Sequence, residues 1–87
     1  MQNKYTVRIP HRPRKSYAKI PQPWHKRIAI ALKILEIDPF IGITMTGDMA
    51  DKRKVVIWPY RIIYRIRQKQ KVIEILEIEH RQNTSYR

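Results

Sequence analysis

The stretch from Lys54 to Glu79, KVVIWPYRIIYRIRQKQKVIEILEIE, decides the fold of this chain because it reads as a run of consecutive strands. Trp58-Pro59 and the polar residues 68–71 divide it into three apolar runs, at 54–57, 60–67 and 72–79. The runs are rich in β-branched residues, which favour strands, and proline cannot donate to a sheet ladder. The stretch therefore predicts three antiparallel strands.

The loop between the second and third of these strands sets their register. A three-residue loop from Lys69 to Lys71 places Gln68 opposite Val72 and Arg61 opposite Glu79, an opposite-charge pair. A slip of one residue would move every side chain to the other face. In the favoured register, one face carries Ile62, Tyr64, Ile66, Val72, Leu76 and Ile78.

The residues before this stretch predict a strand and two helices. Alternation of apolar and polar residues from Lys4 to Ile9 predicts a strand, and a short helix is expected from Arg14 to Lys19. A second helix is expected with Pro23 in its first turn, an apolar stripe from Trp24 onward and an end at Asp38-Pro39. Its expected core stripe is Trp24, Ile28, Ala31, Leu32 and Leu35, broadened by Ile30, Ile34 and Ile37. Residues 40–51 read as a loop or a short extended segment.

Helices followed by a run of strands indicate an α+β fold. With 87 residues, the chain is expected to form one small domain over residues 1–87, an N-terminal strand and two helices packed on a twisted antiparallel β-sheet. It contains no cysteine, which removes disulfides and cysteine-based zinc sites. Lys33 interrupts the longest apolar run, and the first residues lack the apolar core of a signal peptide. We therefore expect a cytoplasmic protein without a membrane partner.

The charge of the chain points to a polyanionic partner. It carries 19 Lys and Arg against 7 Asp and Glu, a formal net charge of +12. Residues 1–35 hold nine basic residues and no acidic one. Such a segment faces solvent, phosphate or an acidic partner. Its candidate RNA-binding or ribosome-binding residues, together with Arg53 later in the chain, are Arg12, Arg14, Lys15, Lys19, Lys26 and Arg27.

The side chains limit the chemistry. The seven acidic residues are scattered in sequence, and the three histidines lie far apart, so no metal site and no cofactor is predicted. Metal-free RNA cleavage requires only groups that align the 2′-hydroxyl, move protons and stabilise charge on phosphate. The second half of the chain offers such groups at Lys52, Arg53, Lys54, Arg61, His80, Arg81 and Tyr86. Composition alone leaves catalysis and simple nucleic-acid binding equally open.

Several short motifs, in order along nearly the whole chain, resemble toxins of the RelE/ParE superfamily. The strongest are Tyr60-Arg-Ile-Ile-Tyr64, Lys71-Val-Ile-Glu-Ile-Leu-Glu-Ile78, the Glu79-His-Arg81 ending and Tyr86. Upstream, Lys15 to Pro21, Leu35 to Pro39 and Met45 to Asp48 resemble further family motifs. The chain departs from the pattern at Trp58-Pro59, where Gly-Asp is usual, and at Glu79, which replaces Gly.

The resemblance implies the toxin of a toxin–antitoxin module, with a cognate antitoxin as partner. The RelE branch implies an endoribonuclease that cleaves messenger RNA on the ribosome and so inhibits translation. That cleavage is metal-independent, with the RNA 2′-hydroxyl as nucleophile. Two alternatives stay open, namely a ParE-like inhibitor of DNA gyrase and a basic RNA-binding protein without catalysis.

The RelE-type resemblance also implies which residues are catalytic. Arg61 would stabilise the phosphate, and Arg81 would protonate or stabilise the leaving group. Tyr86 would help to activate the 2′-hydroxyl or stack on a base, and Lys54 matches a basic residue of the preceding strand. Lys52 and His80 are additional candidates, the histidine as an alternative base.

Overall fold

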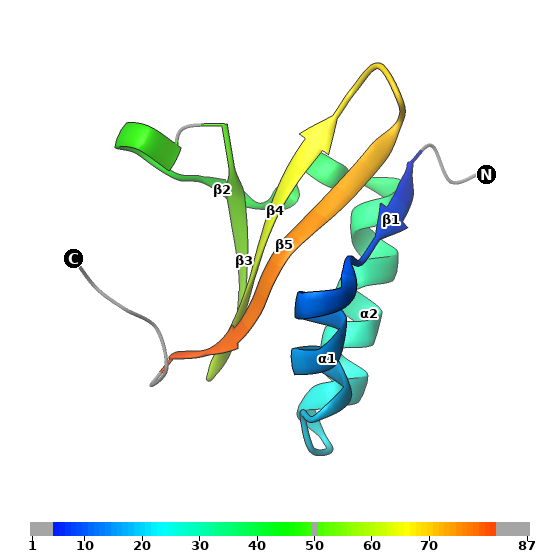
Figure 1. Ribbon diagram of the computed structural model, residues 1–87, viewed down its shortest axis with the longest axis vertical. Helices are drawn as coiled ribbons and strands as arrows, with labels where there is room; N and C mark the ends of the chain where they lie inside the picture. Colours follow the sequence, from blue (N-terminus) through cyan, green and yellow to red (C-terminus); the bar gives the residue numbers. More distant parts are fainter. Residues whose placement is uncertain (1–4, 50, 82–87) are drawn as a thin grey trace.

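A long hairpin forms the centre of the computed structural model, which describes residues 5–49 and 51–81. Its strands are β4 (Tyr60–Arg67) and β5 (Val72–His80). In chain order, the remaining elements are β1 (Thr6–Arg8), α1 (His11–Ala18), α2 (Trp24–Ile37), the 3₁₀ turn η1 (Pro39–Ile41), β2 (Ile43–Thr44), the 3₁₀ turn η2 (Gly47–Met49) and β3 (Arg53–Ile57). The α+β prediction is confirmed (Figure 1).

The five strands form one mixed sheet in the order β1-β5-β4-β3-β2. The strands β2 to β5 pair antiparallel, as predicted for β3 to β5, whereas β1 lies parallel to β5 at the edge. The predicted N-terminal strand is present but shorter, with Thr6 opposite Val72 and Arg8 opposite Glu74. Parallel pairing needs a long connection, which the helices and β2 to β4 supply.

The predicted three-residue loop between β4 and β5 is wrong. Arg67 pairs with Val72, so the loop has four residues, Gln68 to Lys71, and Lys71 adopts a left-handed backbone with φ of 60°. A bulge then leaves Leu76 without a partner opposite β4, which restores the expected pairing of Arg61 with Glu79. The loop is one residue longer than predicted, and the bulge adds one unpaired residue to β5. The two changes shift the register in opposite directions, so they cancel from Glu77 onward.

Because the loop has four residues, β5 contributes different residues to the core than predicted between the loop and the bulge. Ile73 and Ile75 are fully buried with Ile62 and Tyr64, whereas Val72 and Leu76, expected on that face, are only half-buried. Ile78 is buried as predicted.

Helix α1 begins earlier than predicted, at His11 rather than Arg14. Pro10 occupies its N-cap position, and Pro13 lies in its first turn. A missing N–H in the first turn breaks no helical hydrogen bond. Helix α2 spans Trp24 to Ile37 and ends before Asp38, as predicted, whereas Pro23, expected in its first turn, is the N-cap residue.

The buried face of α2 is narrower than the sequence suggested. Ile28, Ala31, Leu32 and Leu35 are buried against the sheet. The predicted additions to the stripe are exposed, by 52% at Ile30, 45% at Ile34 and 62% at Ile37. The sheet covers only one side of α2. Among the described residues, no further layer packs on its other side, so the apolar residues there stay exposed.

The residues between α2 and β3 fold back onto the core through Tyr64. Its hydroxyl donates to the Pro39 carbonyl at 2.7 Å and accepts from the Gly42 N–H at 3.0 Å. Burial raises the pKa of the Tyr64 phenol, so the hydroxyl keeps the proton that it donates. A buried tyrosine thus provides hydrogen-bond partners for two backbone groups of this loop, which would otherwise be buried without one.

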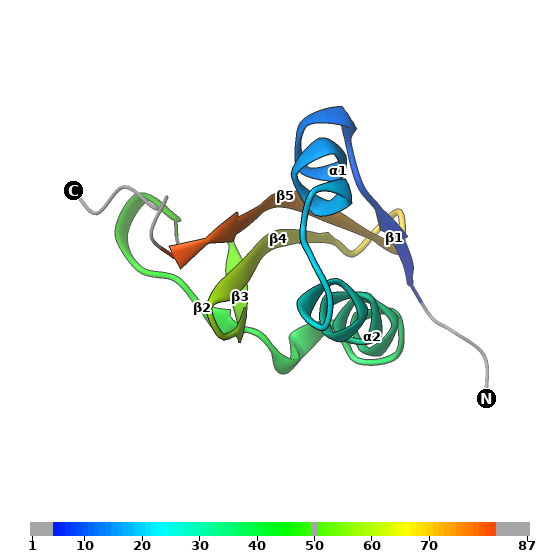
Figure 2. The same cartoon turned by 90° about the horizontal axis from the view of Figure 1, so that it is seen from below.

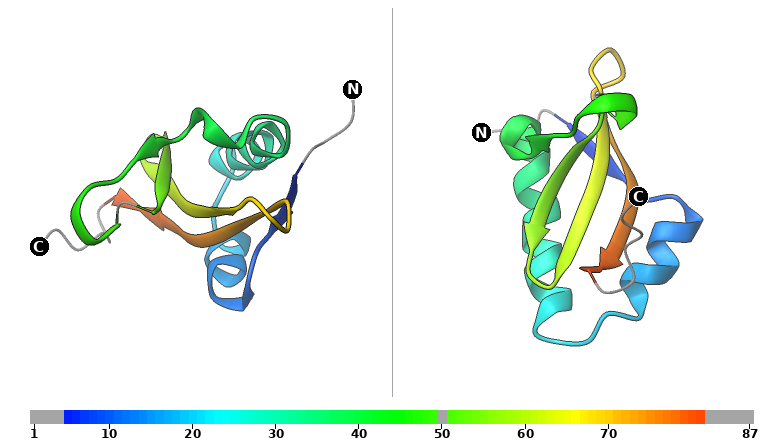
Figure 3. Two further views of the ribbon diagram at one scale, coloured as in Figure 1. Left: turned by 90° about the horizontal axis from the view of Figure 1, so that it is seen from above. Right: turned by 90° about the vertical axis from the view of Figure 1, so that its left-hand side faces the viewer.

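The helices leave one side of the sheet uncovered. Seen from below, α1 lies next to β5 and α2 lies beneath β4 (Figure 2). In the right-hand view of Figure 3, strands β3, β4 and β5 face the viewer with neither α1 nor α2 in front of them. Within the described ranges, no helix is long and apolar enough to cross a membrane.

Candidate functional site

A cavity of about 260 Å³ lies at the turn end of the β3–β4 hairpin. It is lined by the Trp58–Tyr60 segment and by side chains from β3, from β4 and from the residue after β5, among them Lys54, Arg61 and Arg81. Three of the four main catalytic candidates, spread over 28 positions of sequence, therefore meet in one place.

Strand register explains this convergence. Val56 of β3 pairs directly with Arg61 of β4, and Lys54 lies two residues before Val56 on the same face. The Arg81 N–H donates to the Pro59 carbonyl at 2.8 Å, which holds the end of β5 against the hairpin turn. Within the described residues, neither Lys54 nor Arg81 forms an ion pair, so both contribute positive charge to the cavity.

Arg61 is held by the cross-strand partner that the sequence predicted. Its Nε donates to the Glu79 Oε2 at 3.1 Å, and the two side chains are only 19% and 22% exposed. Limited solvent access strengthens this charge-assisted hydrogen bond relative to an exposed pair. A phosphate in the cavity would therefore compete with Glu79 for the Arg61 guanidinium.

Glu77 and Glu79 form an acidic pair beside Arg61. Desolvation raises the pKa of the Glu77 carboxyl, and the hydrogen bond to Glu79 and the charge of Glu79 raise it further. The charges of Arg61 and Arg12 act in the opposite direction. The native state thus binds a proton at Glu77 more tightly than the unfolded chain does.

We expect Glu77→Gln to stabilise the protein at neutral pH. A raised carboxyl pKa means that wild-type stability falls as pH rises above the ordinary carboxyl value of about 4. The advantage of the glutamine variant should grow from that pH upward and level off above the raised pKa. Urea unfolding between pH 3 and pH 8 measures this, with Asp48→Asn, an exposed acid in η2, as control. A pH-independent difference between Glu77→Gln and wild type would contradict the interpretation.

Trp58 is a site residue that sequence reasoning missed. The Arg81 guanidinium carbon lies 4.8 Å from the centre of the Trp58 ring, and that ring is 62% exposed. A cation–π contact of this kind at an exposed site contributes about 0.5–1 kcal/mol. The sequence reading treated Trp58-Pro59 only as a break. Extending the Arg61–Glu79 pairing by two residues would have placed this turn beside Arg81.

The additional catalytic candidates lie outside the cavity. Lys52 forms an ion pair with Asp51 at 3.7 Å. His80 lines a separate cavity of about 480 Å³ with Ser16 and Lys19, and its ring contacts Tyr60 edge-on at 5.0 Å. Strand alternation directs His80 to the opposite face from Glu79. Tyr86 lies outside the described residues.

The candidate RNA-binding residues divide into two groups. Six are exposed along α1, its C-cap and the start of α2, namely Arg12, Arg14, Lys15, Lys19, Lys26 and Arg27. Arg53 instead donates to the carbonyls of Phe40 and Gly42, at 3.3 Å and 2.9 Å. It therefore fastens the segment before β2 to β3, whatever else it contacts.

Within residues 5–49 and 51–81, no group of three His, Asp or Glu side chains could hold a metal ion. The chemistry that this cavity offers is cationic, with one ammonium and two guanidinium groups facing a space open to the sheet surface. Such groups bind a phosphate and stabilise charge that develops on it.

Solved structures place this architecture among the RelE toxins. One chain of the RelBE2 toxin–antitoxin complex of Mycobacterium tuberculosis is 25% identical with a TM-score of 0.81, over 90% of this chain and 99% of that one. One chain of the archaeal RelE–RelB complex of Pyrococcus horikoshii OT3 is 28% identical with a TM-score of 0.72, over 93% and 99%. The isolated E. coli RelE toxin, 17% identical with a TM-score of 0.79 over 93% and 88%, shares the fold.

The sequence gives the narrower assignment. A family model described as the ParE toxin of type II toxin–antitoxin system, parDE, matches residues 7–84. The chain therefore belongs to this toxin family within the RelE/ParE superfamily, and it is the toxin of a type II toxin–antitoxin module. No curated protein matches it.

Proposed function

We propose that this toxin is a metal-independent endoribonuclease that cleaves messenger RNA on the ribosome. The observation that supports this most is the convergence of Lys54, Arg61 and Arg81 on one cavity of the uncovered sheet face. A scissile phosphate bound there would meet cations from three separate segments. The fold is shared with chains of a RelBE2 complex and of a RelE–RelB complex at 25–28% identity, which agrees with this proposal.

The proposed reaction uses the RNA as its own nucleophile. The 2′-oxygen attacks the adjacent phosphorus, a P–O bond forms, and the bond to the 5′-oxygen of the next nucleotide breaks. The 2′-hydroxyl loses its proton and the leaving oxygen gains one, so the products are a 2′,3′-cyclic phosphate and a 5′-hydroxyl. Arg61 and Lys54 stabilise the phosphorane charge, and Arg81 acts at the leaving oxygen. Tyr86 is the proposed activator of the 2′-hydroxyl.

The proposed protein partner is a cognate antitoxin. Two of the matched structures are toxin–antitoxin complexes, and this chain carries a large positive surplus. An antitoxin with an acidic segment would satisfy cations on the toxin and exclude RNA from the cavity by charge competition.

Inhibition of DNA gyrase is the second candidate. The family model that matches is that of ParE toxins. In addition, the Arg61 guanidinium already donates to Glu79, which leaves it less available to a phosphate. If this candidate is correct, the cavity cations contribute to binding a protein rather than to cleavage.

Induced expression in bacteria separates the two functions. The proposal predicts arrest of translation with cut messenger RNA and intact chromosomal DNA. Double replacement of Lys54 and Arg81 by alanine should abolish the arrest, whereas Lys33→Ala, an exposed cation on α2, should not. DNA damage with intact messenger RNA would instead support gyrase inhibition and overturn the proposal.

A further inference from the structure

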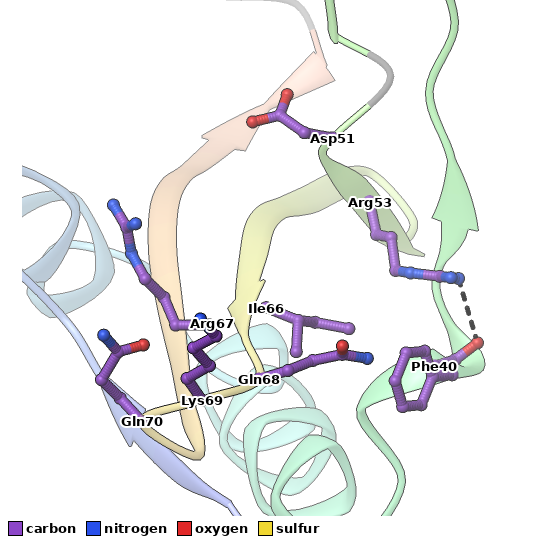
Figure 4. A pocket seen from close by; sticks show the side chains of 8 residues that line it. All are labelled: Phe40, Asp51, Arg53, Ile66, Arg67, Gln68, Lys69 and Gln70. Atoms are coloured by element: carbon purple, nitrogen blue, oxygen red, sulfur yellow. Dashed lines mark hydrogen bonds between the residues drawn. The ribbon is translucent and has the colours of Figure 1, made fainter.

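A second cavity, of about 480 Å³, lies at the opposite end of β4 from the cationic cavity (Figure 4). It is enclosed by η1, the start of β3 and the β4–β5 loop. Its volume falls within the range of about 300–1,000 Å³ typical of small-molecule sites. The RNA cleavage proposed above gives this cavity no role.

Two planar groups form one wall of this cavity. The Phe40 ring is 46% exposed, and the Arg53 guanidinium carbon lies 5.1 Å from its centre. Hydrogen bonds from Arg53 to the carbonyls of Phe40 and Gly42 fix the guanidinium plane in advance. Aromatic rings and guanidinium planes are the groups on which proteins stack unpaired nucleobases.

The loop side of the cavity offers hydrogen bonds. Gln68 and Gln70 each carry an amide that both donates and accepts, as the edges of nucleobases do. In Figure 4 the Gln68 side chain extends from the end of β4 toward the Phe40 ring, below Ile66 in the view. A base stacked on the planar wall would therefore lie within reach of an amide.

The charges around the cavity favour a phosphate. Arg53, Arg67 and Lys69 line it, against one carboxylate, Asp51, and of these cations Arg67 is paired with Glu74 at 3.2 Å. That carboxylate is already engaged, at 3.2 Å by the Nε of Arg65 and at 3.7 Å by the Nζ of Lys52. The surplus of positive charge attracts the backbone of a nucleic acid.

We propose that this cavity binds one unstacked nucleotide of single-stranded RNA, with its base against Phe40 and Arg53. The inference rests on the proposed function for the identity of the strand. Tyr60 and Ile66 mark the two cavities and are six residues apart along β4, or about 20 Å. Arg53 and Ile66 alternate with Lys54 and Arg61 along their strands, so the planar wall lies on the helix-covered face and takes its nucleotide independently of the cationic cavity. An acidic peptide would use the charges but not the stacking wall, so we favour RNA.

Fluorescence anisotropy with uncleavable probes tests this subsite. A 2′-O-methyl octa-adenosine lacks the nucleophile, and an abasic octamer of equal charge lacks the bases. Phe40→Ala should weaken binding of the octa-adenosine about 5- to 100-fold, the usual cost of losing one base–aromatic stack. It should leave binding of the abasic octamer unchanged. Phe40→Tyr, which keeps the ring, and Ile30→Ala, an exposed apolar residue on α2, should bind both probes as wild type does.

Thermal unfolding of each variant shows whether Phe40→Ala remains folded. If it does not, titration of the wild-type chain with adenosine monophosphate provides a second test, in which NMR should show shifts of the Gln68 side-chain amide. Equal affinity of wild type for the two octamers would overturn the subsite. So would Phe40-dependent binding of an acidic peptide together with indifference to RNA. Since neither probe can be cleaved, loss of the proposed ribonuclease activity would leave this result standing, and the reverse also holds.

Discussion

Arg81→Ala is expected to slow the proposed RNA cleavage at least about 100-fold, which is the usual effect of losing one preorganised group that stabilises a transition state. Arg81 is exposed but held, because its N–H is bonded to the Pro59 carbonyl and its guanidinium lies over Trp58. Its charge is thus directed to the cavity that Lys54 and Arg61 share. Single-turnover cleavage on programmed ribosomes measures the rate.

The companion variants separate charge from geometry. Arg81→Lys keeps the charge but loses the planar contact with Trp58, so it should retain part of the activity. Lys33→Ala removes an equal charge from the exposed side of α2 and should cleave at the wild-type rate. RNA affinity should change little in Arg81→Ala, because the group acts mainly as charge develops. A large loss of affinity with an unchanged cleavage rate would show that Arg81 only binds RNA.

Gly42→Ala is expected to destabilise the fold by about 3–5 kcal/mol, the sum of an overpacked core and a disturbed buried hydrogen bond. A Cβ at residue 42 would overlap the Tyr64 hydroxyl and ring. Tyr64 is fully buried between helix and sheet, so it cannot move aside. Urea unfolding, followed by circular dichroism, measures the loss.

A double-mutant cycle tests the cause of this effect. Tyr64→Phe alone should cost about 2–4 kcal/mol, because the Pro39 carbonyl and the Gly42 N–H both lose their partner. In the double variant the added methyl no longer meets a hydroxyl. The double variant should therefore lose less stability than the sum of the losses in the two single variants. Strictly additive costs would mean that the hydroxyl is not what excludes a side chain at residue 42.

The fold was predictable from the sequence where local patterns dominate. Trp58-Pro59 separates two runs of strand residues, and Asp38-Pro39 stops a helix, so these elements were placed correctly. The four-residue loop was not predictable, because Lys71 adopts a backbone conformation that glycine usually occupies. The bulge at Leu76 arises from tertiary packing, since Ile75 and Ile78 both point into the core.

The candidate site was predictable mainly through family resemblance. Composition provided many cations of equal standing, and only the motifs around Arg61 and Arg81 singled out a set. The pairing of Arg61 with Glu79 followed from the register alone. The site role of Trp58 and the exposure of the apolar α2 residues were not predicted. Both depend on which elements pack next to these residues in the fold, and local sequence patterns do not give that.

The chemistry of the cut ends tests the central claim most directly. Programmed ribosomes carrying a messenger with one 2′-deoxynucleotide, placed immediately 5′ of the scissile phosphate, are treated with the toxin. The account predicts that the all-ribose messenger is cut to a 2′,3′-cyclic phosphate and a 5′-hydroxyl, and that the single deoxynucleotide abolishes this cut. Cleavage at the deoxynucleotide, or cut ends that carry a 3′-hydroxyl and a 5′-phosphate, would contradict a metal-independent reaction in which the RNA supplies its own nucleophile.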